Sequence, residues 1–329
     1  MSNHIFHKIN LADYNFLVTG GAGFIGSHIA EYLLKNGAKK VRVLDNMVNG
    51  FENNLAVLSA YDSFEFMEGD IRNLETCMKA TEGIDYVSHQ AALGSVPRSI
   101  KEPVYFNEVN VSGFVNMLNA AIENKVKSFV YASSSSVYGD EPTLPKIESK
   151  IGNCLSPYAA TKKTNELYAQ VFADVYGLKL MGFRYFNIFG PRQDPDGPYA
   201  AVIPLFVKGI MKNTAVYING DGEQTRDFTY VDNAVQINIK GMLSENRDAF
   251  NKVYNVAIGE FYSVNQLYNS CALHLNSEWK PIHRAPRAGD IRNSLADISL
   301  AKSLLNYEPV KKFEQGLMET VNYFKEVYS

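Results

Sequence analysis

The first element of the chain opens with Phe16-Leu17-Val18-Thr19-Gly20-Gly21-Ala22-Gly23-Phe24-Ile25-Gly26. An apolar run precedes the glycines, and a helix-like pattern over residues 28–35 follows them. Glycine at this spacing permits a tight turn, a phosphate against the backbone and close packing of helix on strand. The stretch therefore predicts a strand–turn–helix unit that binds a dinucleotide pyrophosphate. A glycine-rich turn without a ligand is the alternative.

A carboxylate follows the next apolar run. Residues 41–44 end at Asp45, about 20 residues beyond the glycines. An acidic side chain there can accept hydrogen bonds from both ribose hydroxyls, whereas it would repel a 2′-phosphate. The position favours NAD over NADP, unless the carboxylate merely ends a strand.

Composition excludes several classes of protein. The 329 residues are 46% hydrophobic and carry a net charge of −3, which suits a globular core and gives no basic field for nucleic acid or a membrane surface. Cys77, Cys154 and Cys271 lie far apart, and the six histidines form no ligand motif, so we expect neither disulfides nor a metal. Without an apolar signal segment, we expect a cytoplasmic protein whose partners are small molecules and itself.

Short β-like runs alternate with helical patterns through the first part of the chain. The runs cover residues 15–19, 40–44, 64–68, 86–89, 128–133 and 179–185, which indicates an α/β protein with a Rossmann-type, doubly wound parallel sheet. After Tyr185 the pattern breaks into turns containing proline and glycine, and a smaller α/β substrate domain begins. Val253-Tyr254-Asn255-Val256 could return to the first sheet, so we expect the second domain to be partly discontinuous. The predicted domains are 1–186 with 227–258, and 187–226 with 259–329.

Tyr158 and Lys162 lie four residues apart in a predicted helix that runs to about Tyr176, so phenol and ammonium share one face. A nearby ammonium lowers the pKa of a phenol, which would make Tyr158 a base near neutral pH. Lys162 could also hold a nicotinamide ribose. The alternative is a chance pair on a solvated helix face.

A serine cluster, residues 133–136, ends a predicted strand. Open α/β sheets bind ligands at the carboxyl ends of their strands, where a hydroxyl can stabilise a developing oxyanion. Spacing alone does not select one serine, and serines are also common in loops without a function.

These motifs together resemble the extended short-chain dehydrogenase/reductases, specifically nucleotide-sugar 4-epimerases of the UDP-glucose and UDP-N-acetylglucosamine type. The resemblance covers nearly the whole chain. It rests on the glycine motif, Gly69-Asp70-Ile71, His89-Gln90-Ala91-Ala92, Ser133-Ser134-Ser135, Ser156-Pro157-Tyr158 with Lys162, and Arg184-Tyr185-Phe186-Asn187.

The resemblance implies a set of site residues. Ser134, aligned through Val137-Tyr138-Gly139, would be catalytic with Tyr158 and Lys162. NAD would contact Gly20, Gly23, Phe24, Ile25, Gly26, Asp45, Asn46, Asn49, Gly50, Asp70, Ile71, Gln90, Ala91, Ala92, Asn110, Tyr158, Lys162 and Tyr185. The UDP-sugar would contact Gly94, Ser95, Ser134, Ser135, Tyr158, Asn187, Ala201, Val202, Tyr217, Asn219, Arg226, Arg287, Asp290 and Ser294, with both arginines on the diphosphate.

The implied reaction is a transient oxidation at C4 of the sugar, with hydride passing to bound NAD and back to the other face of a 4-keto intermediate. Related dehydratases carry acidic residues where this chain has Ser135 and Ser136, which favours simple epimerisation. Ser294 stands where strict glucose/galactose enzymes carry tyrosine, leaving room for an N-acetyl group.

We therefore expect a UDP-GlcNAc 4-epimerase. The alternatives are 4-epimerases of UDP-N-acetylhexosaminuronic acid or of UDP-glucose/UDP-galactose, a reductase that releases NADH, and a non-catalytic NAD or UDP-sugar sensor. By the same analogy the protein would be a homodimer, with segments 104–123 and 158–176 at the interface.

Overall fold

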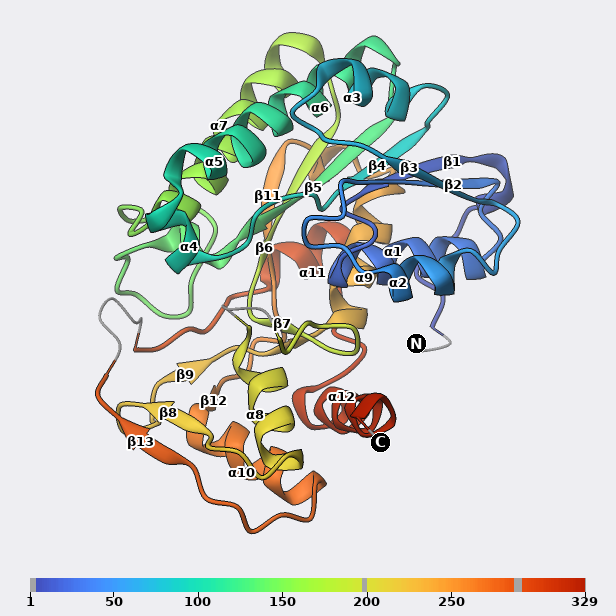
Figure 1. Ribbon diagram of the computed structural model, residues 1–329. Helices are drawn as coiled ribbons and strands as arrows, with labels where there is room; N and C mark the ends of the chain where they lie inside the picture. Colours follow the sequence, from blue (N-terminus) through green and yellow to red (C-terminus); the bar gives the residue numbers. More distant parts are fainter. Residues whose placement is uncertain (1–3, 197–199, 287–291, 329) are drawn as a thin grey trace.

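A seven-stranded parallel sheet forms the centre of the computed structural model, which describes residues 4–196, 200–286 and 292–328 (Figure 1). Its order is β11-β6-β5-β4-β1-β2-β3. The strands are β1 (Asn15–Thr19), β2 (Lys40–Asp45), β3 (Phe64–Glu68), β4 (Tyr86–His89), β5 (Ser128–Ser134), β6 (Leu180–Tyr185) and β11 (Lys252–Val256). The predicted runs are confirmed to within one residue at each end. The predicted return of Val253 to the first sheet is also confirmed, because it pairs with Gly182 of β6.

Helices cover both faces of the sheet, which confirms the doubly wound class (Figure 1). One face carries α1 (Phe24–Lys35), α2 (Glu52–Leu58), α9 (Val231–Met242) and α11 (Ser299–Leu305). The other carries α3 (Leu74–Thr81), α4 (Val96–Lys101), α5 (Pro103–Asn107), α6 (Gly113–Glu123) and α7 (Pro157–Tyr176).

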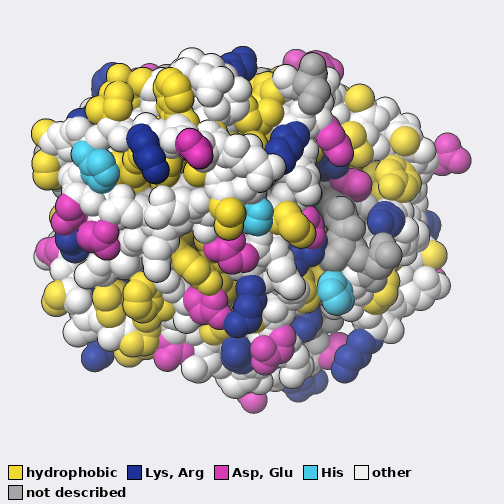
Figure 2. Space-filling view, turned by 90° about the horizontal axis from the view of Figure 1, so that it is seen from below, with side chains coloured by type: hydrophobic (Ala, Val, Ile, Leu, Met, Phe, Trp, Pro, Cys, Tyr) yellow, Lys and Arg dark blue, Asp and Glu magenta, His cyan; other side chains and the backbone are white. Residues whose placement is uncertain are grey.

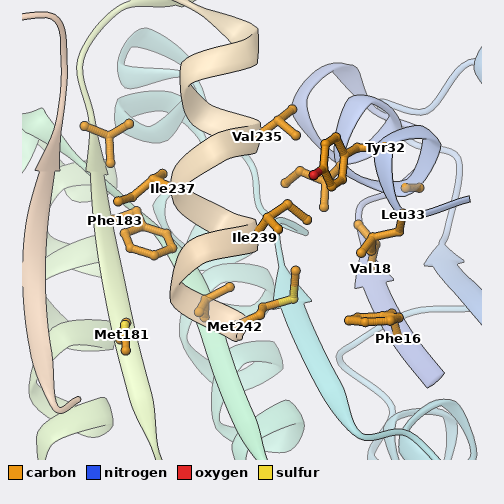
Figure 3. Packing of buried hydrophobic residues seen from close by; sticks show 14 of the residues in the cluster. Phe16, Val18, Tyr32, Leu33, Met181, Phe183, Val235, Ile237, Ile239 and Met242 are labelled. Carbon is orange, nitrogen blue, oxygen red and sulfur yellow. The ribbon is translucent and has the colours of Figure 1, made fainter. Parts of the chain in front are cut away.

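Helix α9 packs on one face of the sheet, over β4 and β5 and beside α1. Figure 3 shows its residues Val235, Ile237 and Ile239 between Tyr32 of α1 and Phe183 of β6. All five side chains are buried in one apolar cluster. Since burying one such side chain contributes about 1.5–3 kcal/mol, this helix, drawn from late in the sequence, is a large part of the first core.

The predicted 104–123 segment is not one regular helix. It divides into α5, a π-helical turn over Glu108–Ser112, and α6. Turns of this kind inside a helix commonly occur at functional sites, because the extra residue redirects side chains. Here Asn110 lies in the turn and is buried.

A smaller α/β region lies below the sheet in the view of Figure 1. Its helices are α8 (Val202–Met211), α10 (Val264–His274) and α12 (Phe313–Tyr328), packed around a separate apolar cluster that includes Phe206, Phe228 and Leu267. Its short strand pairs are β7 (Ile188–Phe189) with β10 (Thr229–Tyr230), β9 (Thr225–Arg226) with β12 (Tyr262–Ser263), and β8 (Tyr217–Asn219) with β13 (Ile282–Arg284). The exact domain boundaries given above stay a prediction.

The surface carries both signs of charge. On the face seen in Figure 2, lysine and arginine side chains alternate with aspartate and glutamate rather than gathering by sign. Across the described ranges, no helix is both long and apolar enough to span a bilayer.

Candidate active site

A cavity of about 1170 Å³ opens at the carboxyl ends of the central strands. Strand β1 lies between β4 and β2, so the chain leaves β1 in one direction and later returns on its other side. Open α/β sheets bind their ligands at such a switch point. The walls bring together these predicted residues: Gly20, Gly23, Phe24, Ile25, Gly26, Asp45, Asn46, Asn49, Gly50, Ile71, Gln90, Ala91, Ala92, Gly94, Ser95, Ser134, Ser135, Tyr158, Lys162, Tyr185, Asn187 and Ala201.

The glycine turn has the close contacts that its sequence predicts. Gly20 has φ +67°, and a Cβ there would lie 2.7 Å from the Ala91 nitrogen. A Cβ on Gly26 would lie 2.2 Å from the Gly20 oxygen. Gly23 is the N-cap of α1 and offers no side chain to the first amides of the helix, which face the cavity. An uncapped helix start of this kind fits a pyrophosphate.

Asp45 lies at the end of β2, beside the glycine turn. Its two carboxylate oxygens accept hydrogen bonds from the amides of Ala22 and Met47, each at 3.0 Å. Burial raises the pKa of Asp45, although these amides lower it in part. The carboxylate keeps further lone pairs toward the cavity, so its position fits the predicted contact with ribose hydroxyls.

Geometry distinguishes among the clustered serines. Ser134 forms a side-chain hydrogen bond with the Tyr158 phenol, and its oxygen also accepts bonds from the Ser136 amide and hydroxyl, at 3.1 and 2.9 Å. Ser133 is turned away, and its hydroxyl donates to Glu166 at 2.7 Å. Of the two, Ser134 is therefore the one placed to act with Tyr158.

The expected effect of Lys162 on Tyr158 is not found. Burial raises the pKa of Tyr158, and only the Ser134 hydrogen bond lowers it in part. The Lys162 ammonium donates to the Ala132 carbonyl at 2.8 Å. Spacing on the helix placed both groups on one face, but it could not show that a strand carbonyl would take the ammonium.

Lys162 itself is only 3% exposed. Burial lowers its pKa to about 8. The neighbouring His89 is also buried, and burial together with the Lys162 charge lowers its pKa to about 3. Because His89 stays neutral, Lys162 is the cation of this part of the site near neutral pH.

A hydrogen-bonded group beside the cavity includes one residue that the sequence reasoning missed. The Tyr185 hydroxyl donates to Gln90 Oε1 at 3.0 Å and accepts from Asn238 Nδ2 at 2.7 Å. Gln90 Nε2 also donates to Ser88 and to Asn238, each at 3.0 Å. Asn238 comes from α9, so only the three-dimensional fold brings it to Gln90 and Tyr185.

Two predicted cofactor residues lie away from the cavity wall. Asp70 pairs with Arg72 at 2.8 Å and accepts from Asn46 at 3.0 Å, and these contacts lower the pKa of Asp70 to about 2. The Asn110 side chain accepts a hydrogen bond from the Leu93 amide and donates to the Leu93 carbonyl and to the Thr161 hydroxyl. Each side chain thus holds a neighbouring segment in place, and its predicted contact with NAD stays a prediction.

Several predicted substrate residues also lie outside the cavity wall, namely Val202, Tyr217, Asn219, Arg226 and Ser294. Asn219 accepts from Arg284 at 2.6 Å, and Arg226 donates to the Thr225 carbonyl at 2.8 Å. The Ser294 amide donates to the same carbonyl at 3.1 Å. Arg287 and Asp290 lie outside the described residues, so their predicted contacts stay predictions.

The cavity wall also includes charged and polar residues that were not among the predicted site residues. Arg98, Lys101 and Glu102 come from α4 and its end, and Gln193 and Asp194 follow β7. Gln193 and Asp194 lie among the turns expected after Tyr185, and their polar side chains were the signal that could have placed this segment at the site. Among the residues described, no group of three or more potential ligands could hold a metal ion.

The chain is similar to a protein family and to several solved structures. Residues 16–257 match the model of the NAD dependent epimerase/dehydratase family. A UDP-N-acetylglucosamine 4-epimerase from Methanobrevibacter ruminantium, solved with UDP-N-acetylmuramic acid, is 40% identical with TM-score 0.90, covering 95% of this chain and 99% of its own. A UDP-glucose 4-epimerase from Thermotoga maritima, solved with UDP-glucose, is 37% identical with TM-score 0.90, covering 96% and 100%.

A third structure holds the cofactor. A UDP-glucuronic acid 4-epimerase from Bacillus cereus, in complex with UDP-glucuronic acid and NAD, is 30% identical with TM-score 0.88, covering 95% and 100%. The resemblance to extended short-chain dehydrogenase/reductases and the expected dependence on NAD are confirmed at the level of the family. This protein belongs to the NAD dependent epimerase/dehydratase family.

Proposed function

We propose that the protein is a UDP-N-acetylglucosamine 4-epimerase that interconverts UDP-GlcNAc and UDP-GalNAc with tightly held NAD. The observation that carries this proposal is the hydrogen bond between Ser134 and Tyr158, beside Lys162, in the cavity that also contains the glycine turn. A proton relay of this kind serves a reaction at a hydroxyl group, whereas a sensor that only binds has no need of one.

The catalytic residues have separate roles in this scheme. Tyr158 takes the proton of the 4-hydroxyl group, and Ser134 binds the same oxygen and the phenol. Bound NAD would supply the hydride acceptor, and afterwards the hydride donor, for the transient oxidation at C4. Lys162 donates three hydrogen bonds as an ammonium, of which one goes to Ala132, so the others are left to stabilise a phenolate and a ribose.

Burial has a consequence for Tyr158. Its pKa is raised in the protein without ligands, so the phenol keeps its proton until a positive charge lies close to it. Binding of ligands that turn Lys162 toward Tyr158 would favour the phenolate. The base would then form mainly when the site is filled, which protects the relay from futile proton exchange.

The neighbours of Ser134 support epimerisation over elimination. Ser136 donates its hydroxyl to Ser134, and Ser135 lies on the cavity wall. Neither side chain can act as the additional acid or base that loss of water requires.

Two observations favour an N-acetylated sugar. Ala201 is small and lies on the cavity wall, and Ser294, although outside that wall, is the small residue that the family resemblance places beside the N-acetyl group. The Methanobrevibacter relative, at 40% identity, is named for UDP-N-acetylglucosamine. UDP-glucose/UDP-galactose and UDP-N-acetylhexosaminuronic acid are the other candidates, since the similar structures include enzymes named for glucose and for glucuronic acid.

Competing substrates test the choice of sugar. The purified protein, loaded with NAD, is given UDP-GlcNAc, UDP-glucose and UDP-N-acetylglucosaminuronic acid separately, and C4 epimers are separated by chromatography. We expect kcat/KM to be at least about tenfold higher for UDP-GlcNAc, equivalent to about 1.4 kcal/mol. Faster equilibration of UDP-glucose with UDP-galactose would contradict the proposal. Ser294→Tyr should reduce turnover of the acetylated pair selectively.

We also propose a homodimer, as the family resemblance implies. Apolar side chains on α5 and α7 stay on the surface of the single chain, with Val104 70% exposed and Val175 65% exposed. A second copy would cover them. Light scattering of the purified protein tests this, and a monomer at micromolar concentration would contradict it.

A further inference from the structure

The chain has unusual backbone geometry on both sides of β7, at Asn187 just before the strand and at Arg192 in the loop after it. Asn187 has φ +37° and Arg192 has φ +66°, a region that residues with side chains adopt rarely. Such conformations persist only where the surroundings hold them, and they cluster at functional sites. The loop of residues 190–194, called here the Arg192 loop, is therefore a segment whose shape other parts of the protein must fix.

Helix α1 supplies the contacts that hold the Arg192 loop. The Arg192 guanidinium forms an ion pair with Glu31 and donates to the Ser27 hydroxyl at 3.4 Å. His28 Nε2 lies 3.0 Å from the Pro191 carbonyl oxygen. Ser27, His28 and Glu31 are spaced so that they share one face of the helix. Three consecutive contacts thus join one helix face to two adjacent residues of the loop.

These contacts are shielded from water. The Arg192 and Glu31 side chains are only 12% and 15% exposed, and His28 is 3% exposed. Burial and the Arg192 charge lower the pKa of His28 to about 3, so the imidazole is neutral and can donate to the Pro191 carbonyl. An ion pair this sheltered is costly to break, because removing one partner leaves the other charge buried.

The loop presents its next two residues to the active site. Gln193 and Asp194 line the cavity, and Gln193 Nε2 donates to the Ile188 carbonyl at 3.1 Å. Gln193 Oε1 is buried and lacks a partner among the described residues. An acceptor of this kind can bind a hydroxyl or amide N–H of a ligand.

Register assigns this wall to the sugar. Tyr185, the last residue of β6, is the register partner of Ser134 of β5, so the chain leaves the sheet beside the proposed proton relay and reaches the Arg192 loop through β7. Helix α1, which holds the Arg192 loop, begins at the glycine turn on the wall of the predicted cofactor site. One helix therefore supports the pyrophosphate side with its first turn and the sugar side with the next.

We propose that Arg192 and Glu31 are a positioning pair that holds Gln193 and Asp194 against the sugar of the bound nucleotide. The inference rests on the proposed function for the identity of the sugar. Neither Arg192 nor Glu31 belongs to the cavity wall. Its loss would let the Arg192 loop relax, and binding of the sugar would weaken while cofactor and nucleotide binding stay intact.

Calorimetric titration tests the pair without relying on turnover. UDP-GlcNAc and UDP are titrated into NAD-loaded wild type, Arg192→Ala, Arg192→Lys, Glu31→Gln and the double exchange Arg192→Glu with Glu31→Arg. We expect Arg192→Ala and Glu31→Gln to weaken UDP-GlcNAc at least about tenfold, with Kd for UDP and the NAD content unchanged. The double exchange and Arg192→Lys should recover part of the loss. KM should rise correspondingly, with kcat nearly unchanged.

A matched control separates positioning from general destabilisation. Arg42 is also 12% exposed and pairs with Glu65 at 2.8 Å, at the edge of the sheet. Arg42→Ala should lower the melting temperature as Arg192→Ala does, but leave UDP-GlcNAc binding as in wild type. Equal weakening of UDP and UDP-GlcNAc, or wild-type affinity in both single variants, would overturn the inference. If Arg192→Ala does not fold, Glu31→Gln alone decides. If wild type binds UDP-GlcNAc without turning it over, the proposed function fails while this test still stands.

Discussion

The Tyr158 phenol is hydrogen-bonded to Ser134, and these two groups come from different elements, the first turn of α7 and the end of β5. The helix begins at an N-cap, Ser156, whose side chain accepts from the Ala159 amide at 3.1 Å. This cap fixes the start of α7, and with it the height of the phenol above the strand. The distance between the two hydroxyls is thus set by local backbone chemistry.

Removing the phenol oxygen should abolish turnover but not binding. Tyr158→Phe loses the base and the Ser134 contact, for which we expect kcat to fall by about 10² to 10⁴. UDP-GlcNAc should still bind within about threefold of wild type, because the ring remains in place. Epimer analysis by chromatography and calorimetry measure the two effects. Residual turnover above a tenth of wild type would show that another group takes the proton.

Asp45 should decide how well the cofactor is held. Asp45→Asn places an amide group against the Ala22 or Met47 amide, so the glycine turn loses an acceptor along with the ribose contact. Hydrogen bonds to charged groups contribute about 1.5–3 kcal/mol, so NAD should bind about 10- to 100-fold more weakly, and preference against NADP should narrow. Cofactor released on denaturation is quantified by chromatography. Asp13→Asn, at an exposed site, is the control.

A methyl group on Gly26 should disrupt the cofactor turn. The added Cβ would lie 2.2 Å from the Gly20 oxygen, which is backbone and cannot move aside. We expect Gly26→Ala to lower the melting temperature and to purify with little NAD. At Gly94 an added Cβ would meet no atom within 4 Å, so Gly94→Ala should keep the melting temperature and the NAD content of wild type. Normal NAD content in Gly26→Ala would show that the turn is wider than described.

The buried ammonium predicts a specific dependence of stability on pH. The pKa of Lys162 is about 8 in the folded protein and 10.5 for the free side chain. Between these values the unfolded chain holds more protons, so stability rises with pH, in total by about 3 kcal/mol. Urea unfolding of the NAD-free protein, measured from about pH 7.5 to about pH 10.5, should show this rise in the free energy of unfolding in wild type and no such rise in Lys162→Met. The same dependence of the free energy of unfolding on pH in both proteins would contradict this prediction.

Much of the fold follows from local patterns. The strands are short apolar runs between turns, so residues 64–68 and 86–89 were placed with their observed bounds. The helix predicted from Tyr158 to about Tyr176 is likewise confirmed, with its first residue at Pro157. The π-helical turn at Asn110 could not be foreseen, because it depends on tertiary contacts with Leu93 and Thr161.

The candidate site was less predictable than the sheet. Residues in the glycine turn are constrained by backbone space, which sequence reveals directly. Contacts such as that of Asn238 with Tyr185, or of Lys162 with Ala132, join elements far apart in the chain and depend on the final packing. Asp70 lies in the expected segment, yet its neighbour Arg72 satisfies it. Which partner a polar group chooses is decided by geometry that composition does not record.

Because α9 and β11 follow β7, α8, β8 and β9 in the sequence, the chain must pass through the first part of the smaller region before its first sheet is finished. A fragment that stops after β6 would expose the bare edge of that strand, together with the apolar surfaces of Tyr32 and Phe183 on which α9 rests. Such a fragment should aggregate when expressed alone. The part of this enzyme that contains the glycine turn is therefore not one continuous segment, and cutting the chain once cannot release it as a unit that folds alone.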